Sequence, residues 1–171
     1  MRVVLPPSFA VWRYIMASNV SATSGKGIAE KAKEVAGLVK GKPYVWGGKS
    51  VSSGFDCSGY VGFVFCGLFS NRINDFSLNA SGFSTSTLFK DVDDPVSGDI
   101  IYFSPEGTLP GHVGIVYNAD MWVGSQSSTG VAFVNFTNPF WGKRSRKIRR
   151  LIESSPASVS AGLGSLMVRV C

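Results

Sequence analysis

Residues 43–61 read PYVWGGKSVSSGFDCSGYV, and this stretch decides the fold expected for the chain. Its glycines interrupt regular structure as far as Asp56, a residue type favoured at helix N-caps. Beyond it, apolar residues recur at helical spacing: Val61, Val64, Phe65 and Leu68. A buried helix is therefore predicted to begin near Cys57. A thiol at a helix N-terminus is stabilised as thiolate by backbone N–H groups and the helix dipole, which makes Cys57 a candidate nucleophile.

Upstream of this stretch, residues 24–40 predict an amphipathic helix. Lys and Glu occupy one face, and Gly41 and Pro43 are expected stop signals. The opposite face is apolar at spacings of three and four: Ile28, Ala32, Val35, Ala36 and Val39. The segment should pack this apolar face against the rest of the domain.

Downstream, residues 70–97 are rich in Ser, Asn, Asp and Thr, and we expect loop there with a short helix around Ser84 to Phe89. After Gly98, β-branched and aromatic runs alternate with turn residues, which predicts strands at 99–103, 112–117, 121–125, 131–136 and 146–152. Helices followed by strands indicate an α+β fold, with N-terminal helices packed on an antiparallel β-sheet of about five strands.

A chain of 171 residues fits one domain, which we place at 24–152 between an N-terminal arm, 1–23, and a C-terminal extension, 153–171. The arm has a passing likeness to a secretory signal, but Pro6, Pro7 and Arg13 interrupt the apolar region that a signal needs. An arm packed on the domain is the preferred interpretation. No transmembrane segment is expected, because no stretch of about 20 apolar residues occurs near the start.

The cysteines and the single histidine limit which disulfide, metal and catalytic sites the chain can form. Three cysteines, Cys57, Cys66 and Cys171, show no repeated spacing, which argues against a disulfide framework and a zinc site. Cys66 falls inside the predicted helix, where a buried inert residue is expected. A single histidine, His112, excludes a His-rich metal site and is the one candidate for a catalytic imidazole. We expect no metal and no cofactor.

The net charge of +6 indicates an anionic partner. Its basic excess is concentrated at 143–150, where a solvated face, an anionic wall polymer and lipid headgroups remain alternatives. The chain shows no signature of an RNA-binding sheet or of a DNA-reading helix pair, so nucleic acid is not the expected partner.

Three motifs occur in this order: PYVWGGKSVSSGFDCSGYV at 43–61, SGDIIYF at 97–103 and GHVGIV at 111–116. Together they resemble the NlpC family of papain-like cell-wall cysteine peptidases, from about Ile28 to Arg150. The resemblance implies an NlpC-type papain-like fold in which Cys57 attacks an amide carbonyl and His112 acts as base and then acid.

The resemblance also implies substrate contacts. Tyr44 would hold the oxyanion together with the backbone N–H of Cys57. Asp56 and Ser58 would contact the free amine of a peptidoglycan stem peptide. Asp56 thus has two candidate roles, as helix N-cap and as substrate anchor, and the sequence does not separate them.

The departure from the family pattern concerns the third catalytic residue, usually a histidine on the next strand that orients the imidazole. The equivalent position falls near Gly124, and Gln126 shares its face because side chains alternate along a strand. Gln126 is our choice, since its carbonyl oxygen can accept from an imidazole N–H. Ser125 is the alternative if a bulge shifts the register, and a purely structural Gln126 is the third interpretation.

The function expected is hydrolysis of a peptidoglycan stem-peptide amide, by an endopeptidase or an amidase that acts in the periplasm or cell wall after export or injection. Its deployment would be that of a secreted antibacterial toxin, with a cognate immunity protein as partner, or of a phage lysis enzyme. The alternatives are an acyltransferase or deamidase on the same fold and a non-catalytic peptide-binding module.

Overall fold

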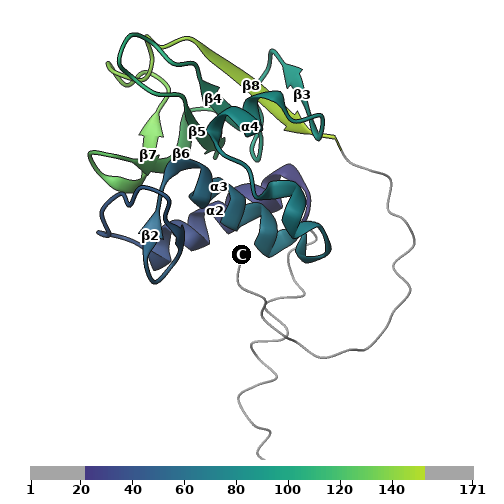
Figure 1. Cartoon of the computed structure of the whole chain (residues 1–171). Coiled ribbons are helices and arrows are strands. Elements are labelled where there is room, and N and C mark those ends of the chain that lie inside the picture. The colour runs from purple at the N-terminus through teal and green to yellow at the C-terminus, as the bar shows by residue number, and fades with distance from the viewer. Residues whose placement is uncertain (1–21, 153–171) are drawn as a thin grey trace, which may run out of the picture.

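The computed structural model describes residues 22–152. The predicted arm, except for its last two residues, and the predicted C-terminal extension lie outside this range, so the domain limits stay a prediction. Figure 1 shows the helices α2 (Gly25–Leu38) and α3 (Cys57–Leu68) in one layer, with the larger sheet above them. No helix of the described residues is long and apolar enough to cross a membrane.

Both helices begin at side-chain caps. The Ser24 hydroxyl accepts a hydrogen bond from the backbone N–H of Gly27 at the start of α2, and the Asp56 carboxylate accepts from that of Gly59 at the start of α3. The predicted apolar face of α2 is buried. The hydroxyl of the buried Tyr60 donates to the carbonyl of Ala32, which ties the two helices together.

The larger sheet is antiparallel throughout and has six strands in the order β3-β8-β4-β5-β6-β7. The strands are β3 (Phe89–Val92), β4 (Ile100–Phe103), β5 (His112–Val116), β6 (Met121–Gln126), β7 (Gly130–Asn135) and β8 (Arg146–Leu151). Five of them match the predicted strands, and the α+β class is confirmed. A separate two-stranded hairpin, β1 (Lys49–Ser50) with β2 (Gly54–Phe55), precedes α3.

The sequence prediction fails between residues 70 and 97. This segment holds a 3-10 helix η1 (Ser70–Phe76), a helix α4 (Ala80–Thr85) and the edge strand β3. The short helix lies at 80–85 instead of 84–89, because the Asn79 side chain caps it by accepting from Gly82 N–H. Strand β3 shows little alternation because only Phe89 is fully buried, and it forms through pairing with β8.

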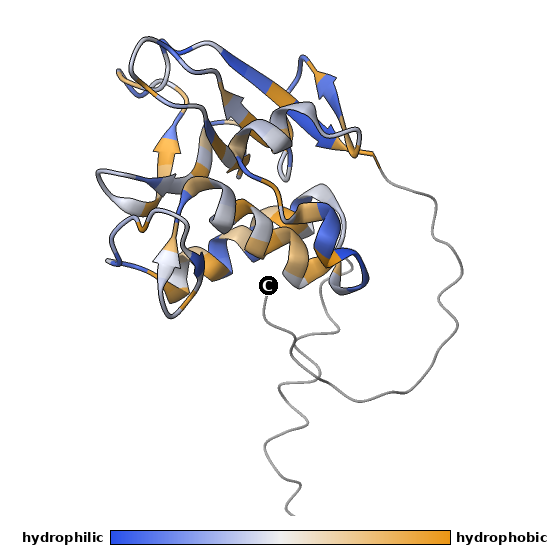
Figure 2. Ribbon diagram, viewed as in Figure 1, coloured by the Kyte–Doolittle hydropathy of each residue, from blue (hydrophilic) through white to orange (hydrophobic). Residues whose placement is uncertain are grey.

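The central strands of the sheet, β4, β5 and β6, are buried on both faces. The main core lies between the sheet and the helices, whose hydrophobic residues are orange in Figure 2. A smaller core lies on the opposite face, where Phe103 and Trp122 pack with Trp141 from the segment before β8. A Cβ at Gly114 would collide with the Trp122 ring, so glycine makes room for this second core. The second core holds the histidine in place.

Candidate active site

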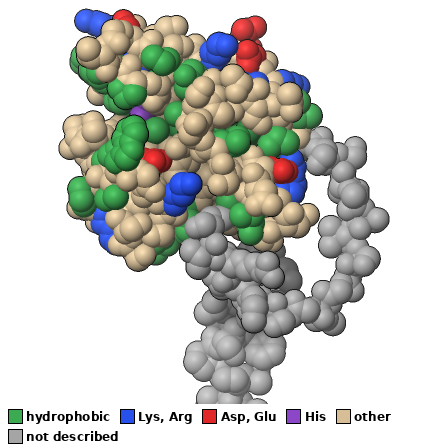
Figure 3. Space-filling view, in the orientation of Figure 1, with side chains coloured by type: hydrophobic (Ala, Val, Ile, Leu, Met, Phe, Trp, Pro, Cys, Tyr) green, Lys and Arg blue, Asp and Glu red, His purple; other side chains and the backbone are tan. Residues whose placement is uncertain are grey.

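A cleft of about 550 Å³ lies where the start of α3 meets the start of β5. Its lining includes the five residues to which the resemblance assigns a role in catalysis or substrate binding: Tyr44, Asp56, Cys57, Ser58 and His112. Gln126 is not among the lining residues. Figure 3 shows the histidine, coloured purple, in a hollow among hydrophobic side chains. The fold therefore brings Tyr44 and His112, which are 68 positions apart in the sequence, to the same cleft.

Cys57 is the first residue of α3 and is buried. Burial, the largest effect, raises the pKa of its thiol, while hydrogen bonding from the backbone of Val113 and Ser58 lowers it in part. The expectation of a lowered thiol pKa at the helix tip is therefore wrong for the resting enzyme, because desolvation outweighs the stabilisation by backbone N–H groups. The resting sulfur is a neutral thiol.

His112 opens β5 and lies in the second core. Its ring centroid lies 4.5 Å from that of Trp141, 5.7 Å from that of Trp122 and 6.2 Å from that of Phe103. Burial first, and the positive charge of Arg144 second, lower the pKa of His112 to about 3. The resting imidazole is therefore neutral and has a free lone pair, as a general base requires.

Tyr44 lies within interaction range of the nucleophile. Burial, followed by the charges of Cys57 and Asp56, raises the pKa of Tyr44 to about 12. Its phenol therefore stays protonated at neutral pH and remains a hydrogen-bond donor. A donor beside the attacking sulfur suits the oxyanion role that the resemblance implies.

The Asp56 carboxylate acts as the N-cap of α3. Its Oδ1 accepts from Gly59 N–H at 2.6 Å and from the Ser58 hydroxyl at 3.0 Å, and its Oδ2 accepts from Gly47 N–H at 3.0 Å. A Cβ at Gly59 would collide with the carbonyl oxygen of Gly48, so the glycine pair packs directly on the helix start. The carboxylate of Asp56 thereby joins the segment at Gly47 to the start of α3, beside Cys57. A further role as substrate anchor stays a prediction.

Gln126 is the last residue of β6 and is buried. Strands β5 and β6 pair Ile115 with Val123 and Val116 with Trp122, and this register, if continued to the strand ends, would set Gln126 opposite His112. Residues opposite one another in an antiparallel pair present their side chains to the same face. Both the Nε2 of His112 and the Nε2 of Gln126 are buried and lack a hydrogen-bond partner within residues 22–152.

Ser125, the alternative third residue, presents its hydroxyl to the helix layer. Its Oγ donates to the Phe55 carbonyl at 2.8 Å. The β6–β7 pairing runs without interruption from Met121 to Gln126, so no bulge among these pairs turns Ser125 toward the face of His112.

Sequence reasoning missed several residues of the cleft, among them Trp141 and Arg144. Arg144 was taken for part of a basic surface, yet it is 7% exposed and lines the cleft. Its guanidinium carbon lies 5.1 Å from the ring centroid of Trp141. Trp141, a large aromatic residue shortly before Arg144 in the sequence, was the available signal, because tryptophan is highly buried on average.

Within residues 22–152, no group of three or more His, Cys, Asp or Glu side chains is placed to hold a metal ion. The described cysteines, Cys57 and Cys66, are both thiols. Cys66 lies in the interior of α3, where its Sγ contacts the carbonyl of Ile73.

The NlpC/P60 family model matches residues 41–150, so the chain belongs to the NlpC/P60 family. It is a hydrolase of the cysteine-peptidase class. The resemblance drawn from the three motifs is thus confirmed.

Curated relatives are named as endopeptidases, two of the following three as endopeptidases of peptidoglycan or murein. A probable endopeptidase of Haemophilus influenzae is 31% identical over 112 residues, which are 65% of this chain and 67% of that protein. The probable peptidoglycan endopeptidase LytE of Bacillus subtilis is 30% identical over 104 residues, 61% of this chain and 29% of that protein. Murein DD-endopeptidase MepS/Murein LD-carboxypeptidase of Escherichia coli K12 is 31% identical over 118 residues, 68% of this chain and 59% of that protein.

Solved structures show the same fold. The NlpC/p60 domain of the peptidoglycan hydrolase SagA matches with a TM-score of 0.52 and 23% identity, over 74% of this chain and 98% of that one. NlpC1 from Trichomonas vaginalis matches with a TM-score of 0.57 and 21% identity, over 78% of this chain and 46% of that one. The predicted NlpC-type fold is confirmed.

Proposed function

We propose that this protein hydrolyses an amide bond of a peptidoglycan stem peptide, with Cys57 as nucleophile and His112 as general base. One observation carries the proposal: a single cleft brings together a thiol at a helix tip, a neutral imidazole and a protonated tyrosine. The substrate class comes from the relatives named as peptidoglycan endopeptidases.

The protonation states define the first step. As the sulfur of Cys57 bonds to the amide carbon, its proton passes to the neutral imidazole of His112. The carbonyl oxygen becomes an oxyanion, which accepts hydrogen bonds from the Tyr44 hydroxyl and the backbone N–H of Cys57. The imidazolium then protonates the leaving amine, and the carbon–nitrogen bond breaks. Water, deprotonated by His112, hydrolyses the thioester and restores the thiol.

Gln126 is proposed to orient His112. With the amide oxygen and nitrogen exchanged, an assignment that the hydrogen-bond network must decide, Gln126 Nε2 would donate to Thr129 Oγ1 across the present 3.0 Å contact. Thr129 would still donate to the Gly130 carbonyl, 3.2 Å away. The Gln126 carbonyl oxygen would then be free to accept a hydrogen bond, and we assign it to the Nε2–H of His112, a buried atom without a partner among residues 22–152.

Asp56 and Ser58 are proposed to bind the free amine of the stem peptide. Both line the cleft beside Cys57. Asp56 Oδ2 accepts only the Gly47 N–H among the described contacts, so this oxygen has lone-pair capacity for an ammonium group as well.

The test is mass spectrometry of soluble fragments from purified peptidoglycan sacculi incubated with wild type, Cys57→Ala and Cys66→Ala. The two substitutions remove the same atom from one helix, inside and outside the cleft. Wild type and Cys66→Ala should release the same fragments, whose masses identify the bond, and Cys57→Ala should release none. Absence of fragments with wild type would contradict the proposal and favour the acyltransferase, deamidase or binding-module alternatives.

Deployment as an antibacterial toxin in the periplasm forms a further part of the proposal. It requires a cognate immunity protein that blocks the Cys57 cleft. Directing the wild-type chain to the periplasm of a sensitive bacterium should lyse the cells, whereas Cys57→Ala should not. If the wild type is active on sacculi but its expression in the periplasm is harmless, the toxin role is contradicted and the hydrolase activity still stands.

A further inference from the structure

Arg144 is a buried cation whose partners leave it incompletely satisfied. It is 7% exposed, and its Nη2 donates to the carbonyls of Ser104 at 2.8 Å and Pro110 at 2.9 Å. Its Nε is buried without a partner in the described chain. Among residues 22–152 it forms no salt bridge. Two carbonyl dipoles therefore hold this guanidinium without an anion to balance its charge.

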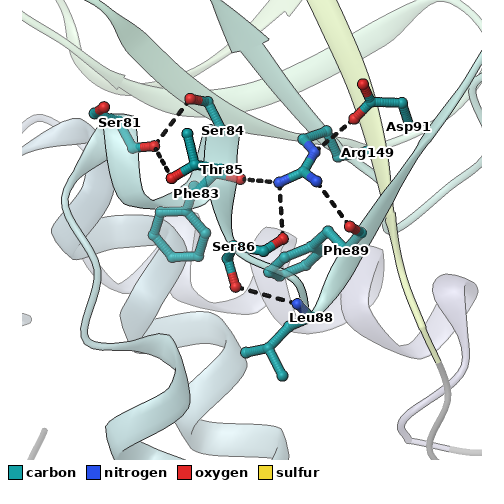
Figure 4. Close-up of polar contacts among 9 residues, drawn as sticks. All are labelled: Ser81, Phe83, Ser84, Thr85, Ser86, Leu88, Phe89, Asp91 and Arg149. Carbon is teal, nitrogen blue, oxygen red and sulfur yellow. Dashed lines mark hydrogen bonds and ion pairs between the residues drawn. The ribbon is translucent and has the colours of Figure 1, made fainter.

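Arg149, five residues further on, is 7% exposed as well, but its charge and its N–H donors are satisfied within the protein, as is usual for a buried arginine. Figure 4 shows its guanidinium enclosed by acceptors. Its Nε bonds to the Asp91 carboxylate at 2.7 Å, and the other nitrogens reach backbone carbonyls of Phe83, Ser86 and Phe89. Every nitrogen of Arg149 is bonded and its charge is balanced, so Arg149 has no capacity left for a ligand.

Three aromatic rings surround the guanidinium of Arg144. The guanidinium carbon lies 5.1 Å from the Trp141 ring centroid, 5.8 Å from that of Phe103 and 6.0 Å from that of Phe140. Aromatic faces attract cations but leave the N–H edges available. An unbalanced charge removed from water is costly unless an anion completes it. Because Arg144 lines the cleft with Cys57 and His112, a substrate can supply that anion.

The cleft is also polarised. The positive charge of Arg144 acts on His112, whereas the negative charge of Asp56 acts on Cys57 and Tyr44. The cation thus lies on the histidine side and the carboxylate on the cysteine side. A peptide with an amine at one end and a carboxylate further along fits this arrangement in one direction only.

We propose that Arg144 is a specificity residue that binds a free carboxylate of the substrate peptide on the His112 side of the scissile amide. This inference rests on the proposed function. A guanidinium is suited to the task because its N–H groups match the geometry of a carboxylate. Stem peptides offer two such groups, the α-carboxylate of a γ-linked glutamate and the C-terminal carboxylate, and Arg144 recognises the chemistry they share.

The test measures binding, so it does not depend on cleavage. Calorimetry with Cys57→Ala would compare three forms of one synthetic stem tetrapeptide: unmodified, amidated at the glutamate α-carboxylate, and amidated at the C-terminus. One amidation should raise the Kd about 10- to 100-fold, the range of a charge-assisted hydrogen bond. That amidation identifies which carboxylate Arg144 binds.

The same titrations in Cys57→Ala/Arg144→Gln separate recognition from a merely structural role. Arg144→Gln should weaken binding of the unmodified peptide by a similar factor and abolish the effect of amidation. Arg144→Lys, which keeps the charge, should retain part of that effect. Amidation effects of equal size with and without Arg144, or no effect of either amidation, would overturn the inference.

The same peptides distinguish this inference from the proposed function. If the unmodified peptide binds with the predicted dependence on Arg144 but wild type does not cleave it, the carboxylate site stands and hydrolysis fails. If wild type cleaves all three peptides with equal kcat/KM, hydrolysis stands and the carboxylate site fails.

Discussion

Two buried arginines lie within one basic segment, residues 143–150, and the two differ in how completely their hydrogen bonding is satisfied. Arg149 in β8 joins the edge strand β3 and the end of α4 to the sheet through a carboxylate and three backbone carbonyls. Arg144 lies against the cleft with one nitrogen bonded to carbonyls and another, Nε, without a partner in the described chain. The first arginine completes its own hydrogen bonding within the protein, whereas the second does not.

This difference teaches that burial alone does not reveal what a charge is for. Both side chains are 7% exposed, so only the count of satisfied donors separates them. A fully bonded arginine is expected to stabilise the fold, and an incompletely bonded one beside a nucleophile is expected to act on substrate. The predictions below test this separation, from the largest effect to the smallest.

Removing Arg149 should cost stability and spare the chemistry. Arg149→Met deprives Asp91 and three carbonyls of their donor, and we expect a loss of about 3–5 kcal/mol in the free energy of unfolding. Urea denaturation measures the loss, with exposed Lys147→Met as control at under about 0.5 kcal/mol. At temperatures where both variants are folded, kcat/KM should match wild type. Equal stability of the two variants would break the comparison.

The burial of His112 should make the free energy of unfolding depend on pH. The folded-state pKa of His112 is about 3, while an unfolded histidine titrates near 6.5. As pH falls, the unfolded state binds the proton first, so the contribution of neutral His112 is complete above about pH 6.5 and lost as pH falls toward 3. Between pH 7 and pH 4 the loss should be about 3 kcal/mol.

His112→Gln isolates this contribution. Urea denaturation across the same pH range should show a shallower fall in unfolding free energy for the variant than for wild type. If the unfolding free energies of variant and wild type fell in parallel with pH, the pKa of His112 would be the same in the folded and unfolded states. That result would contradict a buried, neutral His112.

Gln126 should affect turnover more than binding. Gln126→Leu removes the proposed acceptor for His112, and we expect kcat to fall about 10-fold with little change in KM. Gln126→His restores a ring nitrogen that can accept a hydrogen bond, and activity should return. If both variants lose activity equally while remaining folded, Gln126 is structural, through its contact with Thr129.

Much of the fold could be predicted because its signals are local. The apolar period of residues 24–40, the Asp56 cap and five alternating runs each depend on neighbouring residues, and all appear in the structure. The strand β3 could not be predicted from its FKDV sequence, because its pairing with β8 comes from residues about 60 positions later, such as Leu151 opposite Phe89.

The candidate site divides in the same way. The motifs single out Tyr44, Cys57 and His112, and the structure places all three around one cleft. The ionisation of Cys57 could not be predicted, because the helix start is visible in the sequence but the burial that raises its pKa is not. Within the basic segment, the burial of Arg144 and Arg149 could not be predicted for a related reason, since a string of Lys and Arg does not tell which side chains turn inward.

The sequence by itself determined the family, the helix that begins at Cys57 and the identity of the one histidine, since these depend on residue type and short-range order. Only the tertiary structure decided which groups lose contact with water. Desolvation is a property of packing between distant segments, and it sets the neutral state of His112, the full bonding of Arg149 and the unbalanced charge of Arg144.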